Sequence, residues 1–332
     1  MSSKSKIGIT GCVGFIGFTI TRILLERGYE VVGIDNKDGL VYPVQLKEQR
    51  LEALKKFSNF TFIEGDLNDP ISLQEFISHK PEVVIHLAAR AGVRHSIKLP
   101  ELYYQSNVNA TLNLLNEMVN SGITNIVMAG TSSVYAGFTP PFKEDMSADR
   151  PLSPYAASKR AAELLLHSYT YLYGLKGLIL RYFTVYGPFG RPDMLIYRLI
   201  YNQFKGQATT IFGDGTQSRS FTYVDDAAIG TIKAIEWLAE QPEGTYDIIN
   251  IGNPESFSLK ELFSLLDGKD GLPLKLTYTN FIPADIKATT ADISKARRIL
   301  GWEPSTSLPK GIEKTWEWFK TNWEWIQNIP LP

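Results

Sequence analysis

The sequence of 332 residues predicts an α/β fold with a doubly wound parallel sheet and a smaller C-terminal α/β lobe. Two observations support this prediction. Short, continuously apolar segments alternate with longer amphipathic segments, as expected for parallel strands that helices cover on both faces. A turn rich in glycine also follows the first apolar segment, as in doubly wound folds that pass from a first strand directly into a helix.

The elements follow one another in a regular order along the first half of the chain. The predicted strands are residues 6–10, 30–35, 60–65, 83–87, 125–130 and 176–181. The predicted helices between them are residues 18–25, 70–78, 100–120 and 153–173. Because ligands bind beyond the carboxyl ends of the strands in such a sheet, we expect the functional side chains to follow these strands.

The second half of the chain predicts the smaller lobe. A helix at 194–205 is followed by short segments at 209–212, 221–224, 246–251 and 274–278. The segment 246–251 is apolar enough to return to the main sheet. Apolar side chains at helical spacing near the end predict an amphipathic helix packed on the body, through Ile312, Trp316, Phe319, Trp323 and Ile326.

The turn after the first strand has the glycine spacing of a dinucleotide-binding site. Gly11 permits the tight turn, Gly14 lets a diphosphate approach the backbone, and Gly17 lets the helix pack on the strand. The second strand ends at Asp35, 18 residues beyond Gly17, near the offset expected for the acid that binds a ribose 2′-hydroxyl. This carboxylate would repel a 2′-phosphate, so we expect NAD rather than NADP in a Rossmann-like domain of residues 1–188.

The helix at 153–173 carries a candidate acid–base pair. Ser153 can cap this helix and Pro154 fits its first position, which places Tyr155 and Lys159 one turn apart on one face. A phenol has a pKa of about 10 and becomes a useful base at neutral pH when a nearby cation lowers that value. An alternative interpretation of this pair alone is an ordinary surface contact; the glycine turn favours hydride transfer.

Composition excludes several classes of function. The 34 basic and 35 acidic residues nearly balance, and no basic cluster is interleaved with aromatic residues, so we expect no nucleic-acid partner. We expect no membrane span, because no apolar run reaches about 18 residues. Residues 1–6 lead into the first strand and suggest no signal peptide, and the single Cys12 fits a reducing compartment. His86, His95 and Cys12 lack metal-ligand spacing, so we expect a cytoplasmic protein without a metal.

The chain resembles extended short-chain dehydrogenases/reductases of the nucleotide-sugar epimerase type over nearly its whole length. The matching motifs are Asp66-Leu67, His86-Leu-Ala-Ala89, Asn107, Thr131-Ser-Ser-Val-Tyr135, Tyr155 with Lys159, and Arg181-Tyr-Phe-Thr-Val-Tyr-Gly-Pro188. In that family the Asp after the third strand contacts adenine and the Leu-Ala-Ala segment lies along the cofactor. The resemblance implies these NAD-binding residues: Gly11, Gly14, Phe15, Ile16, Gly17, Asp35, Asp66, Leu67, Leu87, Ala88, Ala89, Asn107, Tyr155, Lys159 and Tyr182.

The segment after the fifth strand narrows the chemistry. Related 4,6-dehydratases carry an Asp-Glu pair at its second and third positions, and related decarboxylases carry Glu at the third. Here the three residues are Thr131, Ser132 and Ser133. Hydroxyls donate and accept hydrogen bonds but do not store a proton near pH 7, which favours an epimerase. The alternative interpretation is that these hydroxyls cap the end of the strand.

The resemblance implies a mechanism in which Thr131, Tyr155 and Lys159 are catalytic. Tyr155, kept near its phenolate form by Lys159 and the cationic nicotinamide, takes the proton of the sugar C4 hydroxyl while the C4 hydride passes to NAD⁺. The 4-keto sugar turns over, and the hydride returns to its other face. Thr131 hydrogen-bonds the reacting oxygen.

The substrate implied is a UDP-sugar bound largely by residues 189–332, and the closest resemblance is to the UDP-glucuronate 4-epimerases. The implied substrate residues are Arg94, Thr131, Ser132, Ser133, Tyr155, Thr184, Arg191, Thr210, Phe212 and Arg219. Arg191 and Arg219 match positions that bind the nucleotide diphosphate, where the planar guanidinium suits phosphate oxygens. Relatives often carry a second diphosphate arginine near 280–285, but this chain has none there, which leaves Asp285 as a candidate for the ribose or for structure.

Three other functions remain open at this point. The first is 4-epimerisation of UDP-glucose or UDP-N-acetylglucosamine, the second is decarboxylation of UDP-glucuronate, and the third is a non-catalytic NAD-binding regulator. The intact Thr131, Tyr155 and Lys159 argue against the regulator, which needs no proton-transfer pair. The resemblance also implies a homodimer that pairs the helices at 100–120 and 153–173.

Overall fold

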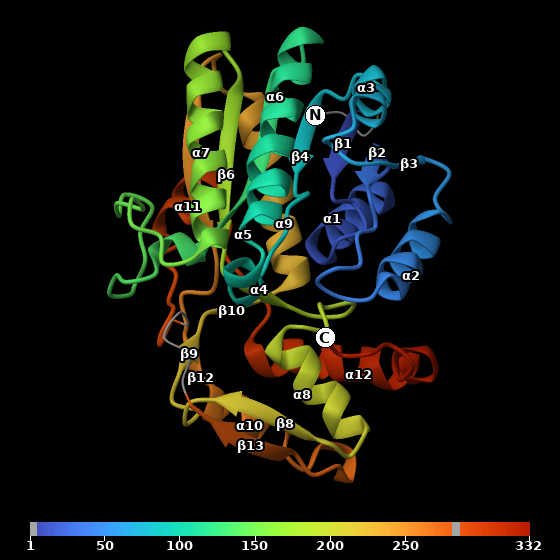
Figure 1. Ribbon diagram of the computed structural model, residues 1–332, viewed down its shortest axis with the longest axis vertical. Coiled ribbons are helices and arrows are strands. Elements are labelled where there is room, and N and C mark those ends of the chain that lie inside the picture. The colour runs from blue at the N-terminus through green and yellow to red at the C-terminus, as the bar shows by residue number, and fades with distance from the viewer. Residues whose placement is uncertain (1–4, 281–285) are drawn as a thin grey trace.

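Seven parallel strands form the main sheet of the computed structural model, which describes residues 5–280 and 286–332 (Figure 1). Their spatial order is β11-β6-β5-β4-β1-β2-β3. The strands are β1 (Lys6–Thr10), β2 (Glu30–Asp35), β3 (Phe60–Glu64), β4 (Val83–His86), β5 (Asn125–Thr131), β6 (Lys176–Tyr182) and β11 (Tyr246–Ile251). The predicted doubly wound fold is confirmed, and the segment 246–251 does join the main sheet beside β6.

The order of the strands fixes where the ligand-binding crevice lies. The chain winds from β1 outward through β2 to β3, and then returns to place β4 on the other side of β1. Such a reversal opens a crevice at the carboxyl end of the first strand. The crevice is therefore flanked by the segments that follow β2 and β4.

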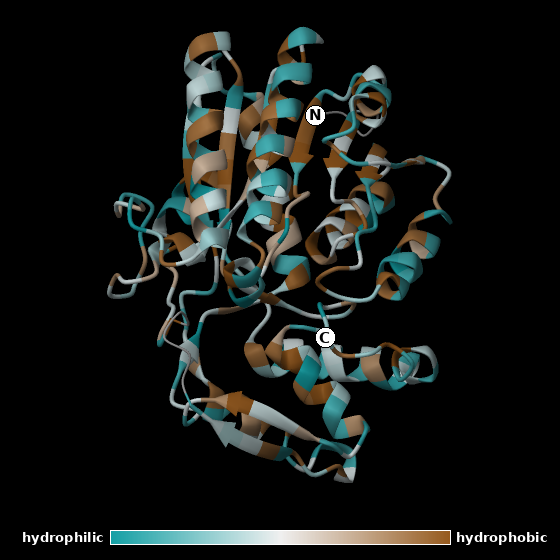
Figure 2. Cartoon of the chain, viewed as in Figure 1, coloured by the Kyte–Doolittle hydropathy of each residue, from teal (hydrophilic) through white to brown (hydrophobic). Residues whose placement is uncertain are grey.

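Helices cover both faces of the sheet, as its apolar strands require. One face is packed by α3 and by the neighbouring pair α6 and α7, and the other by α1, α9 and α11. Figure 2 shows the strands mostly hydrophobic, whereas the covering helices alternate between hydrophobic and hydrophilic residues. The helices are α1 (Phe15–Glu26), α3 (Pro70–Ser78), α6 (Ala110–Asn120), α7 (Pro154–Tyr173), α9 (Val224–Ala239) and α11 (Ser294–Leu300).

The predicted helix at 100–120 is interrupted, which corrects the sequence analysis. It consists of α5 (Pro100–Tyr104), a single π-helical turn at Gln105–Asn109, and α6, with α4 (Val93–Lys98) before it. The polar contacts of Asn107 with the loop after β4 accompany the wide turn. The sequence analysis also left α4, α9, α10 (Leu259–Leu266), α11 and α2 (Val44–Leu54) unassigned, and several boundaries differ by one to three residues.

A smaller lobe packs beneath the carboxyl edge of the sheet (Figure 1). In it the strands β8 and β13 pair in parallel, and the short strands β9 and β12 pair in the antiparallel sense. Its helices surround a separate core in which Trp316 and Phe319 are fully buried, as the tail pattern predicted. The lobe contains α8 (Leu195–Phe204), β8 (Ala208–Phe212), β9 (Ser218–Arg219), β12 (Phe257–Ser258), α10 (Leu259–Leu266), β13 (Lys275–Thr279) and α12 (Leu308–Ile326).

Between the sheet and the lobe lies the short parallel pair β7 (Thr184–Tyr186) and β10 (Phe221–Tyr223). The chain then runs from β10 into α9 and β11, so residues beyond 188 contribute to the main sheet as well as to the lobe. The division at residue 188 stays a prediction. Residues 1–4 and Asp285, which the sequence analysis mentioned, lie outside the described residues.

Candidate active site

A cavity of about 690 Å³ lies at the carboxyl ends of the strands, between the sheet and the lobe. Its wall includes every residue assigned above to catalysis, substrate or cofactor, with the exception of Asn107. Asn107 lies buried behind the wall, where its amide group binds the backbone N–H and carbonyl of Arg90. The roles of the individual residues stay predictions, but the elements bring their side chains together.

The glycine turn has the geometry of an anion site. Gly11 has a positive φ of 73°, and its carbonyl accepts the N–H of Gly14 at 2.9 Å. A Cβ atom on Gly17 would lie 2.1 Å from that carbonyl oxygen, so only glycine lets α1 pack this closely. No side chain caps α1, which leaves its first N–H groups for an anion such as a diphosphate. The residues present therefore fit a dinucleotide.

Behind this turn lies the single cysteine. The Cys12 side chain is completely buried, and burial together with the nearby Asp35 carboxylate raises its thiol pKa well above the usual value. A Cβ atom on Gly33 would lie 2.5 Å from Cys12 Sγ. The thiol thus serves as a small apolar contact between β2 and the turn.

The carboxylate expected to bind ribose is nearly buried and already has partners. Asp35 Oδ1 accepts the backbone N–H of Lys37 at 2.8 Å and pairs with Lys47 Nζ at 3.3 Å. Lys47 comes from α2, which the sequence analysis did not assign, so this contact was missed. The ion pair orients the carboxylate at the end of β2, where the adenosine ribose of a dinucleotide would lie.

Tyr155 and Thr131 meet at the end of β5, as the sequence analysis expected. Ser153 caps α7 by accepting the Ala156 N–H at 3.2 Å, which fixes the first turn of the helix that carries Tyr155. The Thr131 hydroxyl accepts the Ser133 N–H at 3.1 Å and lies close enough to the Tyr155 phenol to lower its pKa. Ser132 and Ser133 continue along the cavity wall. The hydroxyls therefore both cap the strand end and face the site, so the two interpretations hold together.

Electrostatics at the pair differ in part from the expectation. Burial raises the pKa of Tyr155, while the Thr131 hydroxyl and the Arg191 guanidinium lower it. The sequence analysis assigned that lowering to Lys159. Burial lowers the pKa of Lys159 itself to about 8, against the nearby Glu163 carboxylate, which raises it. Lys159 is therefore still mostly protonated at neutral pH.

Glu163 belongs to a buried ion pair that the sequence analysis did not identify. Arg181 donates to both of its carboxylate oxygens, at 3.0 and 2.7 Å, and also to the Tyr135 hydroxyl at 2.9 Å. Both charged side chains are almost completely buried. The available signal was spacing, because Glu163 follows Lys159 by four residues on the same helix face.

A buried histidine links the end of β1 to the helix α7. His86 lies between the Thr10 hydroxyl at 2.7 Å and the Thr111 hydroxyl at 2.9 Å, and burial with the Lys159 charge lowers its pKa to about 3. Thr111 donates to the Asn107 carbonyl, and the Asn107 amide donates to Ser158 in α7. His86 is therefore neutral and structural.

The arginines expected at the nucleotide line the lobe side of the cavity. Arg191 binds Asp193 through two contacts of 3.0 and 2.6 Å, so its charge is compensated inside the site. The Arg94 guanidinium lies 4.1 Å from the centre of the Phe212 ring, and Arg219 donates to the Ser218 and Lys287 carbonyls. The sequence analysis missed Arg198, which lines the same wall. Thr184 and Thr210 lie on that wall too.

Two further properties concern only the described residues. Within 5–280 and 286–332, no group of three His, Cys, Asp or Glu side chains could hold a metal ion. Over the same residues no helix is both long enough and apolar enough to cross a membrane.

Comparison with known proteins places this site in a family. The sequence pattern of the NAD dependent epimerase/dehydratase family matches residues 7–252. The chain belongs to this family. The family assignment confirms the resemblance recognised in the motifs, and it agrees with the glycine turn and the Tyr155–Lys159 pair described above.

Several members of the family are similar over their full length. A UDP-glucuronate 4-epimerase of Thermodesulfobacterium geofontis is 47% identical, and the match covers 97% of this chain and 98% of that protein. The UDP-glucuronic acid 4-epimerase of Bacillus cereus, solved with UDP-glucuronic acid and NAD, is 38% identical with a TM-score of 0.87, over 95% and 99% of the two chains. A UDP-glucose 4-epimerase of Thermotoga maritima, solved with UDP-glucose, is 30% identical with a TM-score of 0.85, over 96% and 99%.

Proposed function

We propose that the protein is an NAD-dependent isomerase, a 4-epimerase that interconverts UDP-glucuronate and UDP-galacturonate. The observation that carries the proposal is the row of hydroxyls Thr131, Ser132 and Ser133 beside Tyr155 at the end of β5. The full-length similarity to UDP-glucuronate 4-epimerases supports the same substrate.

The residues of this chain divide the chemistry between them. NAD, when bound, supplies the acceptor and later the donor of the C4 hydride. Tyr155 exchanges the proton of the C4 hydroxyl, and Thr131 holds the same oxygen through its hydroxyl. The Arg191 guanidinium favours the phenolate electrostatically, and the Lys159 ammonium lies on the turn after Tyr155. Glu163, which pairs with Arg181, raises the pKa of that lysine.

Neutral donors around a C6 carboxylate would also protect the substrate. Oxidation at C4 of a glucuronate gives a β-keto acid, which loses CO₂ readily. Hydroxyls of Ser132, Ser133 and Thr184 can hold the carboxylate with its C5–C6 bond away from overlap with the ketone. A decarboxylase would instead require an acidic side chain at the position of Ser133.

The decisive test is product analysis. Purified protein is incubated separately with UDP-glucuronate, UDP-glucose and UDP-N-acetylglucosamine, and the products are resolved by NMR. We expect UDP-galacturonate from the first substrate only. Formation of a UDP-pentose would contradict the proposal, and turnover of the neutral sugars alone would establish the second 4-epimerase function.

We further propose a cytoplasmic homodimer. The support for a dimer is apolar surface on α5 and α7, where Tyr104, Leu164, Tyr171 and Leu172 are 43%, 50%, 84% and 63% exposed. Light scattering on the purified protein would give twice the chain mass, and Leu164→Glu should shift it toward the monomer. A measured mass of one chain for the wild-type protein at micromolar concentration would contradict this assembly. The single buried Cys12 fits a reducing compartment.

A further inference from the structure

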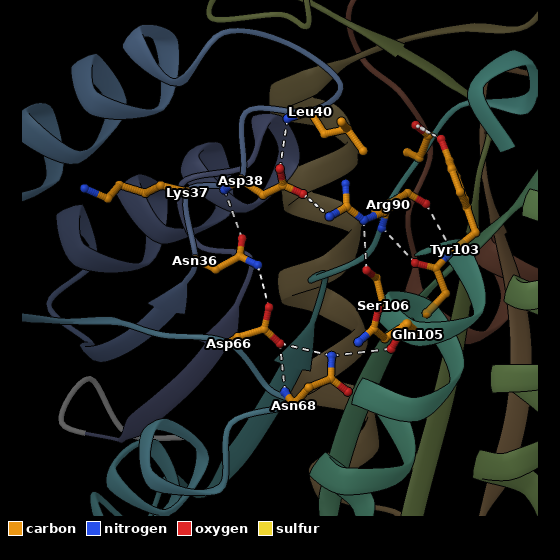
Figure 3. Close-up of polar contacts among 12 residues, drawn as sticks. Asn36, Lys37, Asp38, Leu40, Asp66, Asn68, Arg90, Tyr103, Gln105 and Ser106 are labelled. Atoms are coloured by element: carbon orange, nitrogen blue, oxygen red, sulfur yellow. Dashed lines mark hydrogen bonds and ion pairs between the residues drawn. The ribbon is translucent and has the colours of Figure 1, made fainter. Parts of the chain in front are cut away.

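An ion pair joins the two loops that flank the glycine turn. Asp38 lies in the loop after β2, and Arg90 lies in the loop after β4; their side chains form a close ion pair (Figure 3). In the sheet, β1 lies between β2 and β4. The pair therefore spans the carboxyl end of β1, which is where the glycine turn presents its N–H groups.

Both partners are held in place from outside the pair. Arg90 Nε donates to the Ser106 hydroxyl at 3.0 Å, and the Arg90 backbone is fixed from both sides by Asn107. Asp38 Oδ1 accepts the Leu40 N–H at 2.9 Å, while its other oxygen takes Arg90. The Arg90 and Asp38 side chains are 18% and 30% exposed, so the pair is partly shielded from water.

The same loop is anchored on its other side, and the contacts close into a ring. Asn36 donates to Asp66 at 2.7 Å, and Asn68 bridges Asp66 to the Gln105 carbonyl, next to Ser106. The Asp38 N–H donates to Asn36 at 3.0 Å and completes the circuit. Figure 3 shows this polar ring. Its members that line the cavity are Asn36, Asp38, Asp66, Asn68, Arg90 and Ser106.

We infer that Asp38 and Arg90 form a latch that retains NAD in the groove. This inference rests on the proposed function, because an epimerase that returns its hydride to the same sugar has no need to exchange cofactor. A dinucleotide with its diphosphate on the turn after β1 and its ribose at Asp35 lies under the span of the pair. It can leave only when the two loops part, so the ion pair controls the rate of release.

The test measures release of NAD without using a sugar. Purified holoenzyme is diluted into buffer that contains ethanol and excess alcohol dehydrogenase. This coupling enzyme converts each released NAD to NADH, and the increase in NADH absorbance gives the rate of NAD release. Asp38→Asn and Arg90→Gln should each accelerate release by roughly 3- to 10-fold, the size expected for a partly shielded ion pair. The double variant should be no faster than the faster single variant, since both remove one interaction.

Salt supplies an independent readout. Raising ionic strength from about 0.05 to about 0.5 M screens the pair, so release from the wild type should accelerate while release from Asp38→Asn barely changes. Glu52→Gln is the matched control, because it breaks the exposed Glu52–Lys55 contact of α2 and should leave release unchanged. Thermal unfolding of each variant identifies any that is misfolded. Asp38→Asn removes one charge without changing side-chain size, so it is the variant expected to disturb folding least.

Three outcomes would overturn the latch. The first is an NAD release rate that equals the wild-type rate in both single variants. Acceleration by Arg90→Gln but not by Asp38→Asn is the second, because it would mean that Arg90 binds the cofactor directly. Additive effects in the double variant are the third. A protein that shows the expected release rates yet epimerises no UDP-sugar would refute the proposed function and leave the latch standing.

Discussion

At the scale of single residues, the balance on the Tyr155 phenol decides the chemistry. Burial opposes its ionisation, and the Thr131 hydroxyl and Arg191 guanidinium favour it. The sequence placed Tyr155 and Thr131 together because motif spacing fixes where each strand and helix ends. The sequence did not predict that Arg191 lowers the Tyr155 pKa, because the approach of Arg191 to Tyr155 depends on how the lobe folds back over the sheet.

Removal of the phenolic oxygen should abolish epimerisation without loss of cofactor. For Tyr155→Phe we expect kcat to fall by roughly 10²- to 10⁴-fold, the usual contribution of a positioned acid–base group, with NAD content unchanged. The measurement is the initial rate with UDP-glucuronate beside NAD released on denaturation. Tyr103→Phe is the control, since that hydroxyl donates to the Ala91 carbonyl at 3.2 Å and should have little effect. Unchanged turnover by Tyr155→Phe would refute the assignment.

The lowered pKa of Lys159 predicts that the pH–rate profile falls on its alkaline side. Burial lowers this pKa from 10.5 to about 8, so the ammonium is present below about pH 8 and is lost above it. We expect kcat to fall as the pH rises through that value. For stability the sign is opposite, because the unfolded chain holds this proton up to about 10.5 and the cost of the buried charge is relieved between the two values.

The check is a pH–rate profile of the wild type against Lys159→Arg. The guanidinium stays charged throughout this range, so the variant should lose the limb near pH 8 whatever its absolute rate. The same limb in both proteins would show that another group titrates there.

At the scale of elements, apolar runs were enough to predict the strands of the main sheet. They were not enough for α2, whose buried face includes the charged Lys47 and Arg50, or for the π-helical turn at Gln105–Asn109, whose buried residue is the polar Asn107. Contacts such as Lys47 with Asp35 and Arg90 with Asp38 escaped for the same reason. They join elements through the tertiary fold, and no local pattern encodes them.

The packing of α1 on the glycine turn gives a prediction for an element. A methyl group in Gly17→Ala meets the Gly11 carbonyl, so α1 must shift and carry its N–H groups away from the diphosphate. We expect unfolding free energy to fall by about 1–3 kcal/mol, the range for overpacking, together with loss of bound NAD. Urea denaturation and NAD content measure the two effects.

Gly206→Ala provides the comparison for Gly17. Its φ is +67° and no atom lies near its absent Cβ, so it tests backbone strain alone and should keep NAD. If Gly17→Ala retained NAD as well as Gly206→Ala, the close approach at the turn would not matter for the cofactor.

At the scale of the whole molecule, the smaller lobe has a core of its own. Trp316 is fully buried there, with its ring centre 4.8 Å from that of Phe204 and its indole N–H donating to Asp270. Trp316→Ala should lower the free energy of unfolding by about 3–5 kcal/mol, as expected for loss of a large buried aromatic side chain. Circular dichroism during urea denaturation measures it.

The exposed Ile71 on α3 serves as the reference for Trp316. It is 77% exposed, so Ile71→Ala should change stability by no more than about 0.5 kcal/mol. A loss below about 1 kcal/mol for Trp316→Ala would mean that the lobe does not unfold together with the sheet. Sequence predicted this aromatic helix, because its period is regular, but not the return of α9 and α11 to the main sheet.

The buried Cys12 gives the molecule a built-in reporter. Its thiol lies behind the glycine turn with a raised pKa, so a reagent such as iodoacetamide finds neither access nor thiolate while β2 and the turn stay together. Alkylation will then proceed only through molecules in which this part of the sheet has opened, and the labelling rate will count those openings. Bound dinucleotide should slow the labelling, because it stabilises the contact between β2 and the glycine turn.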